Sequence, residues 1–131
     1  MDKARFEAGL KQRKAVVGEE FVEHAFNTAD DFNREFQELV TEYCFGVCWS
    51  DETLSRKQRS LLNLGMLAAL GRSHEFEIHF KGALRNGCTR EELKAALMQI
   101  AVYCGIPAGV ESFRIARRVL AEWPDGKAAS E

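Results

Sequence analysis

His79 is the residue whose neighbours best suit acid–base chemistry; it lies in the run Glu75-Phe76-Glu77-Ile78-His79-Phe80. At 3.6 residues per helical turn, Phe76, His79 and Phe80 share one apolar stripe, so a helix here points the imidazole among hydrophobic side chains. Glu75 lies four residues earlier on the same side, where its carboxylate can hold one tautomer or raise the basicity of the ring. His79 and Glu75 are therefore the candidate catalytic pair. A core histidine bonded to a backbone carbonyl is the other interpretation, and spacing alone favours it.

Three arginines, Arg56, Arg59 and Arg72, bracket the apolar segment before His79. A guanidinium binds a carboxylate through two parallel hydrogen bonds, so these residues are candidates for binding an anionic substrate. Arginines at solvated helix ends need no ligand, and the pattern fits that interpretation equally well.

The four cysteines are Cys44, Cys48, Cys88 and Cys104, and no two of them form a CxxC pair. Cys44 and Cys48 are one helical turn apart, but no second pair of Cys or His is near in sequence, so no metal site is predicted. We expect reduced thiols in a cytoplasmic protein. The sequence also lacks a glycine-rich phosphate loop, a GxSxG elbow and an HExxH motif, which leaves nucleotide hydrolysis, serine hydrolysis and zinc-protease chemistry without support.

Apolar residues recur at intervals of three and four, prolines are few and strand signals are nearly absent, so the fold class is all-α with about six or seven helices. Ser55 and Thr89 each begin a capping-box pattern. The segment from Leu61 to Leu70 is apolar nearly all round and is predicted to be central, whereas the helix over 31–45 is predicted to pack peripherally. The expected helices span 3–17, 20–27, 31–45, 56–70, 73–86, 89–104 and 107–120.

The chain has 131 residues, 46% of them hydrophobic, which is enough for one domain with its own core. We expect a single domain over residues 1–124 and a flexible, polar tail over 125–131. The net charge is −2, from 18 basic and 20 acidic residues, so neither nucleic acid nor an anionic membrane is an expected partner. No secretory signal or apolar run of the ~20 residues needed for a membrane span is found.

Several blocks in order along the chain resemble the carboxymuconolactone decarboxylase family, most closely its 4-carboxymuconolactone decarboxylase branch. The resemblance covers about residues 5–119, and no single block decides it; their order and spacing do. The blocks are Phe32-Asn33-Arg34-Glu35-Phe36-Gln37-Glu38, Phe45-Gly46-Val47-Cys48-Trp49, Leu54-Ser55-Arg56-Lys57-Gln58-Arg59, Met66-Leu67-Ala68-Ala69-Leu70-Gly71-Arg72, the His79 segment, Asn86-Gly87-Cys88-Thr89-Arg90-Glu91-Glu92 and Tyr103-Cys104-Gly105-Ile106-Pro107-Ala108.

This resemblance implies an alkylhydroperoxidase-D-like helical fold, a homo-oligomer such as a trimer or a trimer of dimers, and a cofactor-free lyase of the protocatechuate (β-ketoadipate) pathway of aromatic catabolism. The implied substrate is a small anionic lactone, 4-carboxymuconolactone, which would lose CO2 to give 3-oxoadipate enol-lactone. His79 would then serve as hydrogen-bond donor or acid, with Glu75 supporting it. Arg56, Arg59 or Arg72 would hold the substrate's second carboxylate, and Trp49, Phe76 and Phe80 would form an apolar wall around the leaving one.

The family's alkylhydroperoxidase-D-like branch carries a glutamate, a CxxC and a histidine on the same two helices. When the sequences are registered on His79, Ser60 stands at the glutamate position and Arg72 and Glu75 stand at the two cysteine positions. A thiol antioxidant function is therefore disfavoured, because disulfide exchange needs both thiols.

The chain also departs from the decarboxylase branch. Val47 stands where that branch usually has a glutamate, and Asp51-Glu52-Thr53-Leu54 replaces an Arg-Pro-Gly-Leu turn. Two alternatives to the parent reaction remain open, namely a related carboxylated butenolide as substrate and a non-catalytic oligomer that uses the scaffold to bind a ligand.

Overall fold

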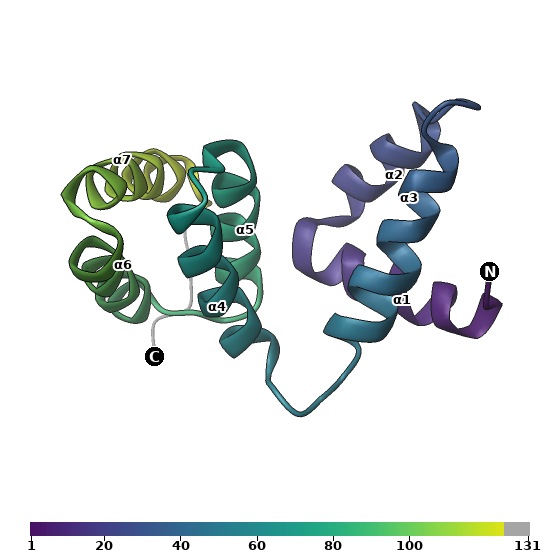
Figure 1. The fold of residues 1–131 in the computed structure, drawn as a ribbon, viewed down its shortest axis with the longest axis horizontal. Coiled ribbons are helices and arrows are strands. Elements are labelled where there is room, and N and C mark those ends of the chain that lie inside the picture. The colour runs from purple at the N-terminus through teal and green to yellow at the C-terminus, as the bar shows by residue number, and fades with distance from the viewer. Residues whose placement is uncertain (125–131) are drawn as a thin grey trace. The chain divides into compact units, whose positions relative to one another are not determined.

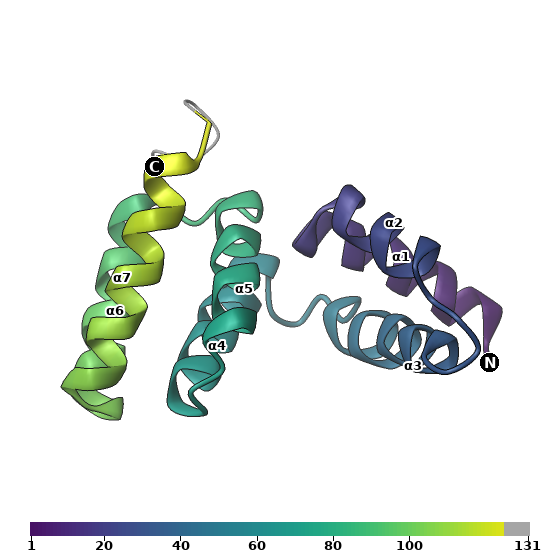
Figure 2. The ribbon, with the colours of Figure 1, turned by 90° about the horizontal axis from the view of Figure 1, so that it is seen from above.

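The computed structural model describes residues 1–124, and every regular element in that range is helical (Figures 1 and 2). The prediction of an all-α fold with about seven helices is confirmed. The described residues form two compact units, the first spanning Met1–Ser55 and the second beginning at Arg56. The single domain expected over residues 1–124 stays a prediction, and the tail expected over 125–131 lies outside the described residues. No helix within residues 1–124 has the length and apolar character needed to cross a membrane.

The first unit consists of α1 (Lys3–Val17), α2 (Glu19–Asn27), α3 (Arg34–Leu39) and the π-helix η1 (Val40–Trp49). The N-terminus of α1 is capped by Asp2, whose carboxylate accepts a hydrogen bond from the Arg5 backbone N–H at 3.0 Å. Inside the unit, the buried Arg13 guanidinium donates to Thr41 Oγ1 at 3.0 Å and to Gln37 Oε1 at 2.8 Å. This polar contact joins α1 to the α3–η1 segment and satisfies a charge that burial would otherwise penalise.

The segment α3–η1 differs from the single helix predicted over 31–45, because it begins later, ends later and changes to π-helical geometry at Val40. Two glycines explain how η1 packs so closely on α1. A Cβ on Gly9 would lie 1.9 Å from the Thr41 carbonyl oxygen, and a Cβ on Gly46 would lie 2.4 Å from that of Arg5. Only residues without a side chain allow the two backbones to approach to this distance.

Three aromatic residues of the 31–45 segment, Phe32, Phe36 and Tyr43, are exposed, and a fourth, Phe45, is buried. Phe32 is 94% exposed and Phe36 is 60% exposed, whereas Phe45 and Trp49 are buried and their rings stack with centroids 5.9 Å apart. The interior of this unit is therefore built by the π-helical part of the segment.

The second unit consists of α4 (Arg56–Ala69), α5 (Ser73–Arg85), α6 (Arg90–Cys104) and α7 (Ile106–Glu122). Helices α4 and α5 lie side by side, and α6 and α7 form the pair that packs against them (Figures 1 and 2). The capping box at the start of α6 is confirmed, because Thr89 Oγ1 accepts from the Glu92 N–H at 3.0 Å and Glu92 Oε1 accepts from the Thr89 N–H at 2.8 Å. The core of this unit is formed by Leu64, Phe76, Phe80, Ala83, Leu84, Cys88, Leu93, Leu97, Ile100, Ile115, Ala116 and Val119.

The prediction that the apolar α4 helix is central is wrong in part. Only Ser60 and Leu64 of this helix are buried, whereas Leu62 and Met66 are about half exposed and Leu70, just after the helix, is 73% exposed. The cause is the arrangement of the unit. Leu62, Met66 and Ala69 line an open groove between α4 and α6, so these side chains of α4 stay accessible to solvent.

The contact between Gly9 and Thr41 gives a test of the first unit. We expect Gly9→Ala to lower the free energy of unfolding by about 2 kcal/mol or more, because the new methyl group meets backbone that cannot move aside. Gly65→Ala is the matched control, since a Cβ there meets nothing within 4 Å and should stabilise α4 by about 0.5–1 kcal/mol. Urea unfolding of the full chain measures both, and equal effects of the two substitutions would contradict the close packing of α1 on η1.

Candidate active site

His79 lies in the middle of α5, half-buried at the edge of the second unit's core. Its neighbours Phe76 and Phe80 on the same helix are fully buried and stack with ring centroids 6.2 Å apart. Across the helix pair, the amide nitrogen Nδ2 of Asn63 on α4 lies 3.4 Å from Nδ1 of the His79 ring. The imidazole therefore has apolar packing on one side and a polar partner from the adjacent helix.

Two opposing effects act on the charge of His79. Burial lowers the pKa of its imidazole because the charged form loses solvation, and the negative charge of Glu75 raises the pKa by a smaller amount. The net direction is downward, so the ring is neutral at neutral pH. A neutral imidazole has one N–H donor and one bare nitrogen.

Glu75, predicted as the partner of His79, has a partner of its own. Its Oε1 lies 3.4 Å from Nε of Arg72, three residues earlier, and both side chains are partly exposed. The pair is a surface ion pair of the kind that contributes less than about 1 kcal/mol to stability. Arg72, Glu75 and His79 thus lie along one edge of α5, with a charge pair near its N-terminus and the neutral ring deeper along the helix.

The remaining predicted site residues fall into three groups. Phe76 and Phe80 belong to the core of the second unit, and Phe76 also lines a cavity. Arg56 is exposed in the first turn of α4, and Arg59 is half-buried one turn later on the helix that carries Asn63. Trp49 is buried in the core of the first unit, whereas the other predicted site residues belong to the second unit.

One cavity of the second unit, of about 320 Å³, lies between α6 and α7 and has Phe80 in its lining. Two others are larger. The smaller, of about 360 Å³, lies beside the N-terminus of α5 and is lined by residues that include Arg72, Ser73, Phe76, Glu111 and the buried Ser112. It combines an apolar floor with charged groups at its rim, so it brings Arg72 and Phe76 to one cavity.

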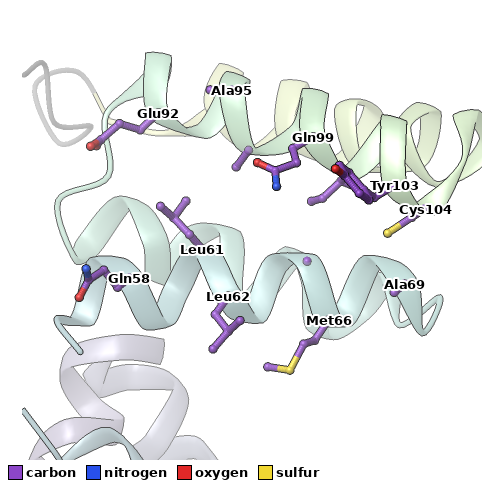
Figure 3. A pocket seen from close by; sticks show the side chains of 13 residues that line it. Gln58, Leu61, Leu62, Met66, Ala69, Glu92, Ala95, Gln99, Tyr103 and Cys104 are labelled. Atoms are coloured by element: carbon purple, nitrogen blue, oxygen red, sulfur yellow. The ribbon is translucent and has the colours of Figure 1, made fainter. Parts of the chain in front are cut away.

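The larger cavity is an open groove of about 810 Å³ between α4 and α6 (Figure 3). Leu61 of α4 and Gln99 and Tyr103 of α6 point toward one another across it. None of the predicted site residues lines this groove. Its lining residues are Gln58, Leu61, Leu62, Gly65, Met66, Ala69, Glu92, Ala95, Ala96, Gln99, Ile100, Tyr103 and Cys104.

Sequence reasoning missed Asn63, whose side chain reaches the His79 ring from another helix. The available signal was an amide placed between Leu62 and Leu64 in an apolar helix. Ser60, one turn earlier on α4, is fully buried and accepts a hydrogen bond from Nδ2 of Asn86 at 2.9 Å. The face of α4 toward α5 therefore carries two polar contacts.

Two of the four cysteines are less readily ionised than a free thiol. Burial raises the pKa of Cys88 to about 11, and it also raises the pKa of Cys44. Among the described residues none of the four is disulfide-bonded. Within residues 1–124, no group of three or more His, Cys, Asp or Glu side chains is arranged to hold a metal ion.

Fold and site together define an all-helical protein with a half-buried, neutral histidine on α5 that faces the adjacent helix α4. The chain belongs to the carboxymuconolactone decarboxylase family, because the model of that family matches residues 34–118. The chain is 40% identical over 120 residues to the nitrosuccinic acid decarboxylase of Metarhizium robertsii, a match covering 92% of this chain and 84% of that one. It is 35% identical over 118 residues to the 4-carboxymuconolactone decarboxylase of Acinetobacter baylyi, covering 90% and 88%.

A third relative, an uncharacterized 15.0 kDa protein of Paracoccus denitrificans, is 31% identical over 124 residues, covering 86% of this chain and 92% of that one. The resemblance inferred from the sequence blocks is confirmed by these matches. Because the two named relatives above are decarboxylases, the chain is an enzyme of the lyase class.

The charge of Glu75 gives a test of the electrostatics at His79. We expect Glu75→Gln to lower the pKa of His79 further, because it removes the negative charge that favours the imidazolium. An NMR titration of the histidine ring protons measures the shift. Glu77→Gln, on the same helix but paired with Arg118 and Lys81, is the control and should leave the His79 titration in place. A rise in the His79 pKa on changing Glu75 would contradict this account.

Proposed function

We propose that this chain catalyses the cofactor-free decarboxylation of 4-carboxymuconolactone, or of a closely related carboxylated butenolide, to 3-oxoadipate enol-lactone in aromatic catabolism. The observation that carries the proposal is the neutral His79 held at the edge of an apolar core, in a member of a decarboxylase family. The 35% identity to the Acinetobacter baylyi enzyme over 90% of the chain supports the substrate.

The reaction needs no external electron sink. When the C–C bond to the leaving carboxylate breaks, the electron pair delocalises through the ring double bond to the lactone carbonyl and forms a dienolate. Protonation of the carbon beside that carbonyl gives the enol-lactone. The protein has to hold the substrate's second carboxylate, surround the leaving carboxylate with apolar groups, donate a hydrogen bond to the carbonyl oxygen and supply a proton to carbon.

The second unit offers groups for each task. His79 is assigned the hydrogen bond to the carbonyl oxygen or the proton delivery, and Glu75 tunes its basicity. Arg72 is the strongest of the three arginines as a carboxylate ligand, because it lines the cavity that Phe76 also lines. Arg56 and Arg59 remain alternatives for that role, and Phe76 and Phe80 are assigned to the apolar wall.

A second substrate, nitrosuccinic acid, is favoured by the 40% identity to the Metarhizium robertsii enzyme over 92% of the chain. Its chemistry is parallel, because loss of CO2 from the carbon that bears the nitro group leaves a nitronate, which is protonated on carbon. In both substrates the leaving carboxylate and a carboxymethyl group are attached to the same carbon. The same donor, cation and apolar wall would therefore serve either reaction, with the nitro oxygens in place of the lactone carbonyl.

The departures from the 4-carboxymuconolactone branch at Val47 and at Asp51 to Thr53 bear on the choice between these two substrates. Both lie in the first unit, at the positions where the 4-carboxymuconolactone branch usually carries a glutamate and an arginine. If those two groups bind the lactone, their absence favours a substrate without the lactone ring, such as nitrosuccinate. A thiol antioxidant function has less support, since the pKa values of Cys44 and Cys88 are raised.

An activity assay tests the proposal. Purified protein is incubated with 4-carboxymuconolactone generated in situ, and separately with nitrosuccinate, without added metal or reductant, and CO2 release is followed. We expect turnover of at least one substrate, and we expect His79→Gln to lower kcat/KM by about a hundredfold or more. His74→Gln makes the same change at an exposed histidine of α5 and should retain activity.

Unchanged kcat/KM in His79→Gln would remove His79 from the mechanism. A folded wild-type protein that binds either compound without releasing CO2 would support the non-catalytic binding module instead.

We also propose that copies of this chain associate through the open side of the second unit. Large apolar side chains are exposed on α4, α6 and α7 and just after α4, and exposed apolar side chains that gather on one face favour association. They are Leu62, Met66, Leu70, Met98, Val102, Tyr103, Ile106 and Val110.

Sedimentation velocity tests this association. Wild-type protein should sediment as an oligomer, and Val102→Glu should shift it toward the monomer, because a charge on the contact face costs desolvation. Ala121→Glu adds the same charge at an exposed site near the end of α7 and should leave the oligomer intact. A monomeric wild type, or an oligomer insensitive to Val102→Glu, would contradict association through this face.

A further inference from the structure

The contact between Asn63 and His79 fixes which ring nitrogen carries the proton. The atom of Asn63 that faces the ring, at 3.4 Å from Nδ1, is the amide nitrogen, which can only donate a hydrogen bond. Nδ1 must then be the acceptor, and a neutral imidazole that accepts at Nδ1 carries its proton on Nε2. The imidazolium has no lone pair at Nδ1, so its formation breaks this contact.

We infer that Asn63 is a positioning residue, which holds His79 as the Nε2-protonated tautomer, so that Nδ1 is the acceptor of the ring and Nε2 carries its N–H donor. The inference rests on the proposed decarboxylase function and deepens it. It assigns to His79 the hydrogen bond to the oxygen that gains charge when CO2 leaves, whether that oxygen belongs to a lactone carbonyl or to a nitro group.

The surroundings of Asn63 support a specific role for its amide. The side chain of Asn63 is half-buried, and its neighbours in the sequence are Leu62 and Leu64. Partial burial of an amide costs hydration free energy, and an apolar residue at this position would avoid that cost. The packing of α4 on α5 does not depend on this amide alone, because Asn86 of α5 also donates to Ser60 of α4 at 2.9 Å. The two contacts join the same helices, but only one of them reaches an ionisable ring.

The charged group that favours the imidazolium, Glu75, is itself paired with a cation. From α5, Glu75 is the charge that favours the imidazolium, and its carboxylate lies 3.4 Å from the Arg72 guanidinium. From α4, the partner is the uncharged Asn63. Burial lowers the pKa of the His79 ring by more than the negative charge of Glu75 raises it, so the ring is neutral. Its Nδ1 can then accept a hydrogen bond from the amide of Asn63.

The experiment is ¹⁵N NMR of histidine-labelled full-length protein, in which protonated and bare ring nitrogens resonate far apart. The chain has three histidines, and His24 and His74 are exposed and serve as internal references. We expect His79 to show a bare Nδ1 and a protonated Nε2. Asn63→Ala should turn this signal into that of a tautomer mixture, and Asn63→Asp should move the proton to Nδ1, because a carboxylate accepts where the amide donated.

Activity is measured on the same variants. Asn63→Ala and Asn63→Asp should lower kcat by about ten- to a hundredfold with little change in KM, because the donor to the reacting oxygen is needed in the transition state more than in the bound substrate. Asn86→Ala is the matched control. It removes an amide that joins the same two helices, and it should lower stability without changing the His79 tautomer or kcat.

The outcomes separate this inference from the proposed function. A proton on Nδ1 of His79 in the wild type, or a tautomer that is unchanged in Asn63→Ala and Asn63→Asp, overturns the role of Asn63 even if His79→Gln is inactive. A tautomer that responds to Asn63, in a protein whose turnover does not depend on His79, supports Asn63 as the residue that sets the ring and refutes the catalytic role of that ring.

Discussion

The second unit depends on α5 burying Phe76, Phe80 and Ala83 while keeping His79 at the rim of the same stripe. On a helix, residues 76, 80 and 83 lie within about 60° of one another, and residue 79 lies next to residue 83 at the edge of that arc. The packing that buries the aromatic rings therefore also fixes the imidazole. Each ring contributes about 2–3 kcal/mol of burial, which leaves α5 little freedom to rotate. The ring of His79 is positioned by the core beside it, and Asn63 of α4 supplies a polar partner.

Most of the fold was predictable because its signals are local. The capping box at Thr89 and the helix end at Gly18 are short-range patterns, and the structure has both. The π-helix was not predictable, since the spacing of apolar residues does not distinguish bonds to the fourth residue from bonds to the fifth. Its close packing on α1 through Gly9 and Gly46 depends on a contact between distant segments, and it appears only in three dimensions.

The same distinction between local patterns and contacts across the fold applies to the candidate site. His79 was predicted as a site residue from its place on an apolar stripe, and Glu75 was predicted as its partner because four-residue spacing is visible in a single helix. The structure adds what a single helix cannot show, namely the ion pair of Glu75 with Arg72 and the amide of Asn63 from α4. The exposed side of α4 has a similar cause. An apolar pattern all round a helix indicates how much apolar surface favours burial. It does not indicate whether that surface packs against the same chain or against another copy.

The chemistry gives a reason for keeping the ring neutral. During decarboxylation, negative charge leaves the departing carboxylate and appears on the carbonyl or nitro oxygen. A full positive charge near both groups would stabilise the bound substrate nearly as well as the transition state and would gain little in rate. A neutral N–H donor aimed at the receiving oxygen favours the transition state selectively, and burial strengthens the interaction by lowering the local dielectric. Arg72, whose charge is shared with Glu75, then suits the spectator carboxylate, which keeps its charge throughout.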